Sequence, residues 1–187
     1  MQDYLNAFNI LTPKEISAFM ALAKPKRLNK GDFFIQEGKI CKEVSFVLDG
    51  CFRSFYHTSS DEEVTYCFTF ENTFVTAYSS FITGHKTAEN IQALTDVNLL
   101  SIPKSEILKL QENSTNWLKL FKLLAEQEYV KMEKRIFLLQ KEDAHIRYKD
   151  LLTNHPEYLQ LIPLQYLSSY LGVTQRHLSR IRKSVTN

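Results

Sequence analysis

The segment from residue 174 to residue 183 carries side chains that could recognise nucleic acid. Arginine can donate two hydrogen bonds to guanine, and glutamine can form a similar pair with adenine. Threonine, histidine and lysine can contact phosphate oxygens, where a cation also releases bound counterions. These residue types predict contacts with double-stranded DNA. The residues expected to make them are Thr174, Gln175, Arg176, His177, Ser179, Arg180, Arg182 and Lys183.

The distribution of charge agrees with this chemistry, although the total charge has no bearing on it. The formal net charge of the chain is only +2. No acidic residue follows Glu157, whereas Arg176, Arg180, Arg182 and Lys183 lie close together near the end of the sequence. A local basic surface without acids is the usual electrostatic sign of a nucleic-acid contact. A solvated basic face on an ordinary helical hairpin is the alternative interpretation.

Two short helices around a glycine turn are predicted to present these side chains, within the segment from Ile162 to Lys183. Pro163 suits the start of the first helix, whose apolar residues recur at helical spacing. Gly172 can adopt the left-handed conformation in which a helix ends. Thr174 is then the expected N-cap of the second helix. The pattern is that of a helix-turn-helix, with an expected inward face of Leu164, Leu167, Tyr170, Leu171, Val173, Leu178 and Ile181.

A longer helix is predicted upstream, because no Gly or Pro interrupts the chain from Trp117 to Gln140. Apolar residues recur along it at intervals of seven, which is typical of a coiled-coil seam between two helices, and we therefore expect a homodimer. The alternative is that the helix packs on its own domain, as we expect for Trp117, Leu120, Leu123 and Leu124. The seam residues are Leu118, Phe121, Ala125, Tyr129, Met132, Ile136 and Leu139.

The first half of the chain is predicted to form a helix followed by β-strands. Thr12, Pro13 and Glu15 match a capping box with a first-turn proline, within a helix expected over residues 5–23. From Lys26 to Ile102 the apolar period changes to two, and glycines and polar pairs separate short strands. This pattern predicts a small antiparallel barrel or roll.

Composition argues against several other classes of protein. No run of about 18 apolar residues is present, so no membrane span is expected. The start of the sequence lacks the basic and apolar regions of a signal peptide, and we expect a cytoplasmic protein. The cysteines are widely spaced and odd in number, so we expect buried thiols rather than disulfides or an iron–sulfur cluster. They are Cys41, Cys51 and Cys67.

An enzyme is not expected, and no catalytic residue or metal ligand is assigned. A small barrel invites comparison with metal-dependent cupins, but the five histidines show no HxH or HExxH spacing. The sequence contains neither a GxSxG motif nor a phosphate-binding glycine loop. Haem sensing stays open as an alternative, although lone histidines such as His57 and His85 are more often surface or core residues.

The order of the elements and several short motifs resemble the Crp/Fnr family of transcription regulators, with the closest likeness to the short members found in Bacteroidetes. Each motif is weak alone, but the ordered set is specific and covers nearly the whole chain. The motifs are residues 28–38 (LNKGDFFIQEG), 46–53 (FVLDGCFR), 91–94 (IQAL), 170–174 (YLGVT) and 178–182 (LSRIR).

The resemblance implies an α+β fold in three parts. An N-terminal antiparallel β-roll, like a cyclic-nucleotide-binding domain, is expected over residues 1–113, a dimerisation helix over 114–140 and a helix-turn-helix domain over 141–187. In the family, two recognition helices enter successive major grooves of a palindromic operator, with half-sites about 34 Å apart. Matched to the family's recognition helix, Gln175, Arg176 and Arg180 would face base edges.

One segment departs from the family. Members that bind cyclic nucleotides carry Gly-Glu early and Arg-Ser late in a phosphate-binding cassette, whereas here Thr76-Ala77 stands in the place of Gly-Glu and residues 85–90 contain no arginine. A cyclic phosphate needs a fixed cation and exposed amides. Glu89 would oppose the charge of Lys86, so cyclic AMP binding is disfavoured. The candidate effector pocket is Phe74, Thr76, Tyr78, Ser79, Ser80, Lys86 and Thr87.

The sequence therefore predicts a dimeric DNA-binding transcription regulator whose β-roll senses an unidentified small molecule. Double-stranded DNA, a second copy of the chain and RNA polymerase are the expected macromolecular partners, and no cofactor is assigned. The alternative with the same fold is a module that senses a ligand or binds a protein, with a degenerate helix-turn-helix that does not bind DNA.

Overall fold

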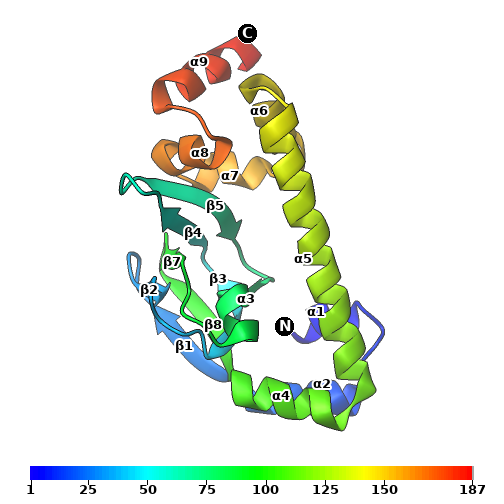
Figure 1. The fold of residues 1–187 in the computed structure, drawn as a ribbon. Helices are drawn as coiled ribbons and strands as arrows, with labels where there is room; N and C mark the ends of the chain where they lie inside the picture. The colour runs from blue at the N-terminus through cyan, green and yellow to red at the C-terminus, as the bar shows by residue number, and fades with distance from the viewer. Residues whose placement is uncertain (187) are drawn as a thin grey trace. The chain divides into compact units, whose positions relative to one another are not determined.

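The computed structural model describes residues 1–186, with the side chain of Thr186 left out (Figure 1). The chain divides into two compact units. The first unit contains Met1–Tyr56 and Phe68–Ala125, and the second contains His57–Cys67 and Glu126–Asn187. Within residues 1–186, none of the helices combines the length and the apolar character that a bilayer span requires.

Two four-stranded sheets form the predicted β-roll, and the strand pairs described in them are antiparallel (Figure 1). One sheet has the strand order β1-β8-β3-β6, and the other has the order β2-β7-β4-β5. The consecutive strands β3 and β4 thus lie in different sheets. The strands are β1 Lys24–Leu28, β2 Phe33–Ile35, β3 Glu43–Asp49, β4 Phe52–His57, β5 Glu63–Thr69, β6 Phe74–Val75, β7 Asn90–Ala93 and β8 Val97–Pro103.

Gly50 makes the sharp turn between β3 and β4 possible. Its φ is +91°, a conformation that residues with a Cβ rarely adopt. A Cβ at this position would also lie 2.4 Å from the Asp96 carbonyl oxygen and 2.8 Å from the Thr95 hydroxyl oxygen. The turn therefore needs glycine for steric as well as conformational reasons.

Strand β3 is buried on both of its faces. Val47 packs with Phe52 in a core cluster to which both sheets contribute. On the other face, the ring of Phe46 contacts those of Tyr4 and Phe74, at centroid distances of 5.5 and 5.1 Å. The N-terminal helical segment thus covers the outer face of a strand that would otherwise expose a phenylalanine to water.

The N-terminal segment forms two helices, so the single helix predicted over residues 5–23 is wrong in its first part. The helices are α1 Gln2–Asn6 and α2 Pro13–Leu22. The predicted capping box is confirmed and explains the break. The Thr12 amide donates to the Glu15 carboxylate at 2.7 Å, and the Thr12 hydroxyl accepts from the Glu15 amide at 3.3 Å. A new helix therefore begins at this point.

A second core cluster joins these helices to α4 Lys104–Asn113 and to the start of α5 Thr115–Lys141. Trp117 is 1% exposed, and its ring lies 4.8 Å from that of Phe19. Leu120 is fully buried beside it. Each such side chain contributes about 2 kcal/mol of hydrophobic stabilisation, so the first turns of α5 are anchored in the first unit.

The second unit contains the rest of α5 and four shorter helices. These are α6 Ala144–Asn154, α7 Pro156–Leu161, α8 Leu164–Leu171 and α9 Gln175–Thr186, while the short helix α3 Tyr78–Thr83 belongs to the first unit. The long helix predicted over residues 117–140 is confirmed. Helix α7 was not predicted, because Pro156 ends one helix and occupies the first turn of the next.

Candidate nucleic-acid interface

The predicted glycine turn between α8 and α9 is present. Gly172 has a φ of +65°, and its amide donates to the Ser169 carbonyl at 3.1 Å. The following amide, that of Val173, donates to the Ser168 carbonyl at 3.0 Å. The Thr174 hydroxyl accepts from the His177 amide at 3.2 Å and caps α9, as predicted. Local sequence therefore fixes the geometry of the turn.

Apolar side chains hold the two helices together. Leu167 and Leu171 on α8 are 1% and 3% exposed, and Leu178 and Ile181 on α9 are 0% and 1% exposed. Helix α6 contacts both α8 and α9. Because each buried side chain contributes about 2 kcal/mol, packing fixes how α9 lies against α8.

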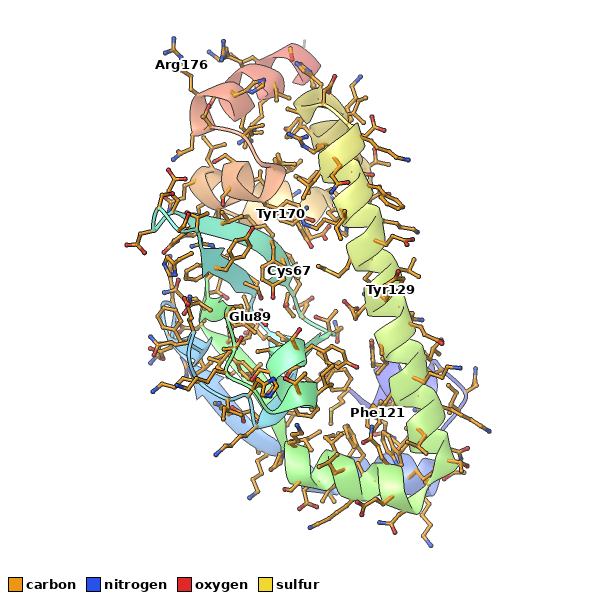
Figure 2. All side chains as sticks on the ribbon, in the orientation of Figure 1. Cys67, Glu89, Phe121, Tyr129, Tyr170 and Arg176 are labelled. Atoms are coloured by element: carbon orange, nitrogen blue, oxygen red, sulfur yellow. The ribbon has the colours of Figure 1, made fainter. Side chains whose placement is uncertain are left out.

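The opposite side of α9 is polar and mostly exposed. Gln175, Arg176 and Arg180 are exposed, and the side chain of Arg176 extends away from the helix in Figure 2. Residues four apart lie on neighbouring positions of a helix, so Arg176 and Arg180 share a face. Neither α8, the turn nor α9 contains an acidic residue. The other predicted contact residues are the exposed Thr174, Arg182 and Lys183 and the half-buried His177 and Ser179.

The predicted seam on α5 contains exposed and packed residues. Tyr129 is 68% exposed, and Met132 and Ile136 are 44% and 45% exposed. Phe121 is half-buried instead and stacks on Trp117, with ring centroids 5.5 Å apart. The other seam residues are the exposed Leu118 and Leu139 and the half-buried Ala125. Exposed apolar residues at this spacing are typical of a surface that a partner covers.

Two hydroxyls of the predicted effector pocket are engaged within the protein. The Ser80 hydroxyl donates to the His85 carbonyl at 2.5 Å and accepts from the Cys41 amide at 2.9 Å. The Thr76 hydroxyl donates to the Glu43 carbonyl at 3.0 Å. These bonds tie the segment to neighbouring backbone and engage two of the hydroxyls that were predicted to face an effector.

The other residues of the predicted pocket lie in different surroundings. Phe74 belongs to the cluster under the N-terminal helices, where its ring lies 5.6 Å from that of Tyr4. The Thr87 hydroxyl accepts from the Glu89 amide at 3.2 Å. Three residues are exposed, namely Tyr78, Ser79 and Lys86. The cassette thus presents one exposed ammonium group rather than a fixed cation.

Sequence analysis did not single out two side chains that join α8 to other elements. The Arg135 guanidinium donates to the Tyr170 carbonyl at 2.7 Å and lies 3.6 Å from the centroid of the Tyr170 ring. The Ser169 hydroxyl contacts the backbone of β5. Arg135 interrupts the apolar pattern of the long helix, and this break is the signal that could have identified it. No comparable signal marks Ser169.

The thiols and the acidic and imidazole groups form no metal centre in the part of the chain that the structure describes. Cys41 and Cys51 are buried, whereas Cys67 is half-buried, and within residues 1–186 no disulfide joins these cysteines. Burial raises the pKa of the Cys51 thiol. Cys41 and Cys51 therefore have the buried position predicted for them.

Comparison by sequence finds one known family that is similar to the β-roll. The pattern of the family described as the cyclic nucleotide-binding domain matches residues 25–114. The matched segment runs from the first strand of the roll to the end of α4. No curated protein sequence matches the chain.

Comparison by structure shows the fold of the whole chain. FixK2 from Bradyrhizobium japonicum has a TM-score of 0.78 at 17% identity, with 88% of this chain and 84% of that chain covered. The c-di-GMP responsive global regulator CLP of Xanthomonas campestris has a TM-score of 0.74 at 16% identity, with coverages of 94% and 92%. A crp/fnr-family transcriptional regulator from Eubacterium rectale has a TM-score of 0.75 at 16% identity, with coverages of 98% and 88%. The chain therefore has the Crp/Fnr fold.

Proposed function

We propose that this chain regulates transcription by binding double-stranded DNA as a homodimer, with α9 as the recognition helix. The observation that carries the proposal is the exposed face of α9, from which glutamine and arginine side chains project on an acid-free pair of helices. The likeness of the whole fold to Crp/Fnr regulators supports the same role. A contact with RNA polymerase rests on this likeness alone.

The polar residues of α9 and its N-cap divide into proposed base contacts and phosphate contacts. Arg176 and Arg180 suit guanine, and Gln175 suits adenine. The Thr174 hydroxyl accepts a hydrogen bond from the His177 amide, so its own proton can still be donated to a phosphate. The remaining contacts, to phosphates or to base edges, are assigned to His177, Ser179, Arg182 and Lys183.

The exposed seam of α5 supports a dimer. A second copy would cover Tyr129, Met132 and Ile136, which are exposed apolar side chains. In a monomer these side chains would stay in contact with water. Two recognition helices related by two-fold symmetry would then read a palindrome whose half-sites lie about 34 Å apart.

The β-roll is proposed to sense a small molecule other than cyclic AMP. The hydroxyls of Thr76 and Ser80 are engaged with backbone carbonyls. Lys86 is exposed, and no arginine occurs in residues 85–90. A cyclic phosphate held by this segment would therefore lack the guanidinium fork that such a ligand favours.

Selection of operators from random duplexes, followed by mobility-shift titration, tests the proposal. Arg176→Ala and Arg180→Ala should each lower affinity for the selected operator by about tenfold to a hundredfold. Wild-type affinity should fall steeply with salt. Arg27→Ala is the control, because Arg27 is an exposed arginine paired with Asp96 in the first unit and should leave affinity unchanged. Wild-type affinity in both α9 variants would show that α9 does not read DNA.

A further inference from the structure

The tip of the β4–β5 hairpin contacts the first helix of the helix-turn-helix. Residues 57–67, which form this tip, belong to the same unit as α8 and α9. The Thr65 amide donates to the Ser169 hydroxyl at 2.9 Å, and that hydroxyl donates to the Glu63 carbonyl at 3.2 Å. One side chain of α8 therefore bonds both a donor and an acceptor of β5.

These two backbone groups lie on the edge of a sheet. Strand β5 is the last in the order β2-β7-β4-β5, so a strand neighbours it on one side only. The Glu63 carbonyl and the Thr65 amide point to the same side of β5, because the backbone groups of alternate residues in a strand point the same way. Unpaired edge groups favour association with another chain. Ser169 occupies the position that a residue of a neighbouring strand would have.

The hairpin tip is ordered by its own hydrogen bonds. The Thr58 amide donates to the Glu62 carbonyl at 2.9 Å, and the Asp61 amide donates to the Thr58 carbonyl at 3.0 Å. The hydroxyls of Thr58 and Ser60 lie 2.9 Å apart. A tip closed in this way can hold a helix in place, because little further entropy is lost when it does so.

The residue next to Ser169 is held by a different element. Tyr170 receives the hydrogen bond and the stacking contact of Arg135 on α5, and its ring meets that of Tyr158 edge-on at 5.8 Å. Figure 2 labels Tyr170 on α8 and Cys67 at the end of the hairpin segment. Burial lowers the pKa of Arg135, but a guanidinium stays charged under all ordinary conditions. The end of α8 is thus fixed from two sides, just before Gly172.

We propose that the hairpin tip is a latch that fixes α8, and thereby the recognition helix α9, in the arrangement that binds DNA. This inference rests on the function proposed above. The turn of residues 172–174 joins α8 to α9 directly, so a restraint on α8 also restrains α9. The latch leaves Arg176 and Arg180 exposed. It therefore orients the reading face instead of covering it, and its release lowers affinity because α8 and α9 must then be ordered on DNA.

Hydrogen–deuterium exchange on the full chain tests the contact without DNA. Ser169→Ala removes the hydroxyl and is a favourable helix substitution. Exchange of the Thr65 amide, and of the amides at residues 172–174, should quicken by about threefold to tenfold. Ser168→Ala is the matched control, since the Ser168 hydroxyl donates to Gln165 within the same helix. Ser169→Thr keeps the hydroxyl and should restore slow exchange.

Fluorescence anisotropy on the selected operator tests the consequence. Ser169→Ala should bind about threefold to tenfold more weakly than wild type, and Ser169→Thr should recover most of the affinity. Unchanged exchange in Ser169→Ala would overturn the latch. Quicker exchange with wild-type affinity would overturn its role in DNA binding and leave the proposed function standing. A wild-type protein without salt-dependent DNA binding would overturn the proposed function, while the exchange data would still decide whether the hairpin holds α8.

Discussion

Replacing Gly172 by alanine isolates the backbone cost of the turn between α8 and α9. The φ of Gly172 is +65°, and the nearest atom to an added Cβ would be a methyl carbon of Leu139 at 3.8 Å. Alanine therefore fits the space but must adopt a left-handed conformation, which costs about 1–2 kcal/mol. Asparagine tolerates this conformation better, because its side chain can bond the local backbone, so Gly172→Asn should cost less than alanine does.

Urea denaturation measures these free energies of unfolding. Gly172→Ala should lower the transition midpoint without changing the m-value. Gly50→Ala provides the contrast, because its Cβ would lie 2.4 Å from the Asp96 carbonyl oxygen and the backbone would have to move. The loss in Gly50→Ala should exceed that in Gly172→Ala by about 1 kcal/mol or more.

Two results would refute this reasoning about the turn. Greater destabilisation by asparagine than by alanine would show that the left-handed backbone of Gly172 is not the origin of the cost. A loss of stability above about 4 kcal/mol in Gly172→Ala would require a defect in the core. No such defect is expected, because the added Cβ would make only an ordinary contact with Leu139.

Hydrogen bonds from Ser114 and the Thr12 backbone lower the pKa of Glu15 from 4.5 to about 2. The stabilisation they give is present above pH 4.5 and is lost as the pH falls towards about 2. The urea midpoints of wild type and Glu15→Gln should therefore converge over that range, and a constant difference would exclude the carboxylate as the cause. Met132→Lys should raise the monomer fraction in sedimentation velocity by placing a charge in the proposed seam, whereas an intact dimer would place the interface elsewhere. Calorimetric titration with cyclic AMP should give no saturable heat, because hydroxyls such as that of Ser80 are engaged internally; a saturable isotherm would contradict the proposed selectivity of the roll.

Local signals were sufficient to predict the turn and the caps. The left-handed Gly172 and the N-cap of Thr174 depend on residues within a few positions of each other. The capping box at Thr12 is local in the same way. Such features can be predicted from the sequence because their hydrogen bonds form within one helical turn. Helix α7 was not predicted from local signals, because Pro156 follows one helix directly and begins the next.

Contacts between distant segments could not be predicted. Thr65 and Ser169 are 104 positions apart in the sequence, and their hydrogen bond exists because β5 is the last strand of its sheet. Apolar periodicity shows which residues are buried but not what buries them. Phe121 was therefore assigned to the seam from its spacing, although its ring stacks on Trp117. Phe74 was likewise assigned to the candidate effector pocket, although it packs under the N-terminal helices.

The hairpin contact and DNA binding must influence each other equally if the proposed latch is correct. An eight-residue helix such as α8 has little stability of its own, so its position depends on what touches it. A contact that raises DNA affinity by some factor is itself favoured by DNA by the same factor. Operator DNA should therefore slow exchange of the Thr65 amide by about the factor that Ser169→Ala loses in affinity. Unchanged exchange on binding, in a protein whose affinity depends on Ser169, would mean that the serine acts through the fold of α8 and not through the hairpin.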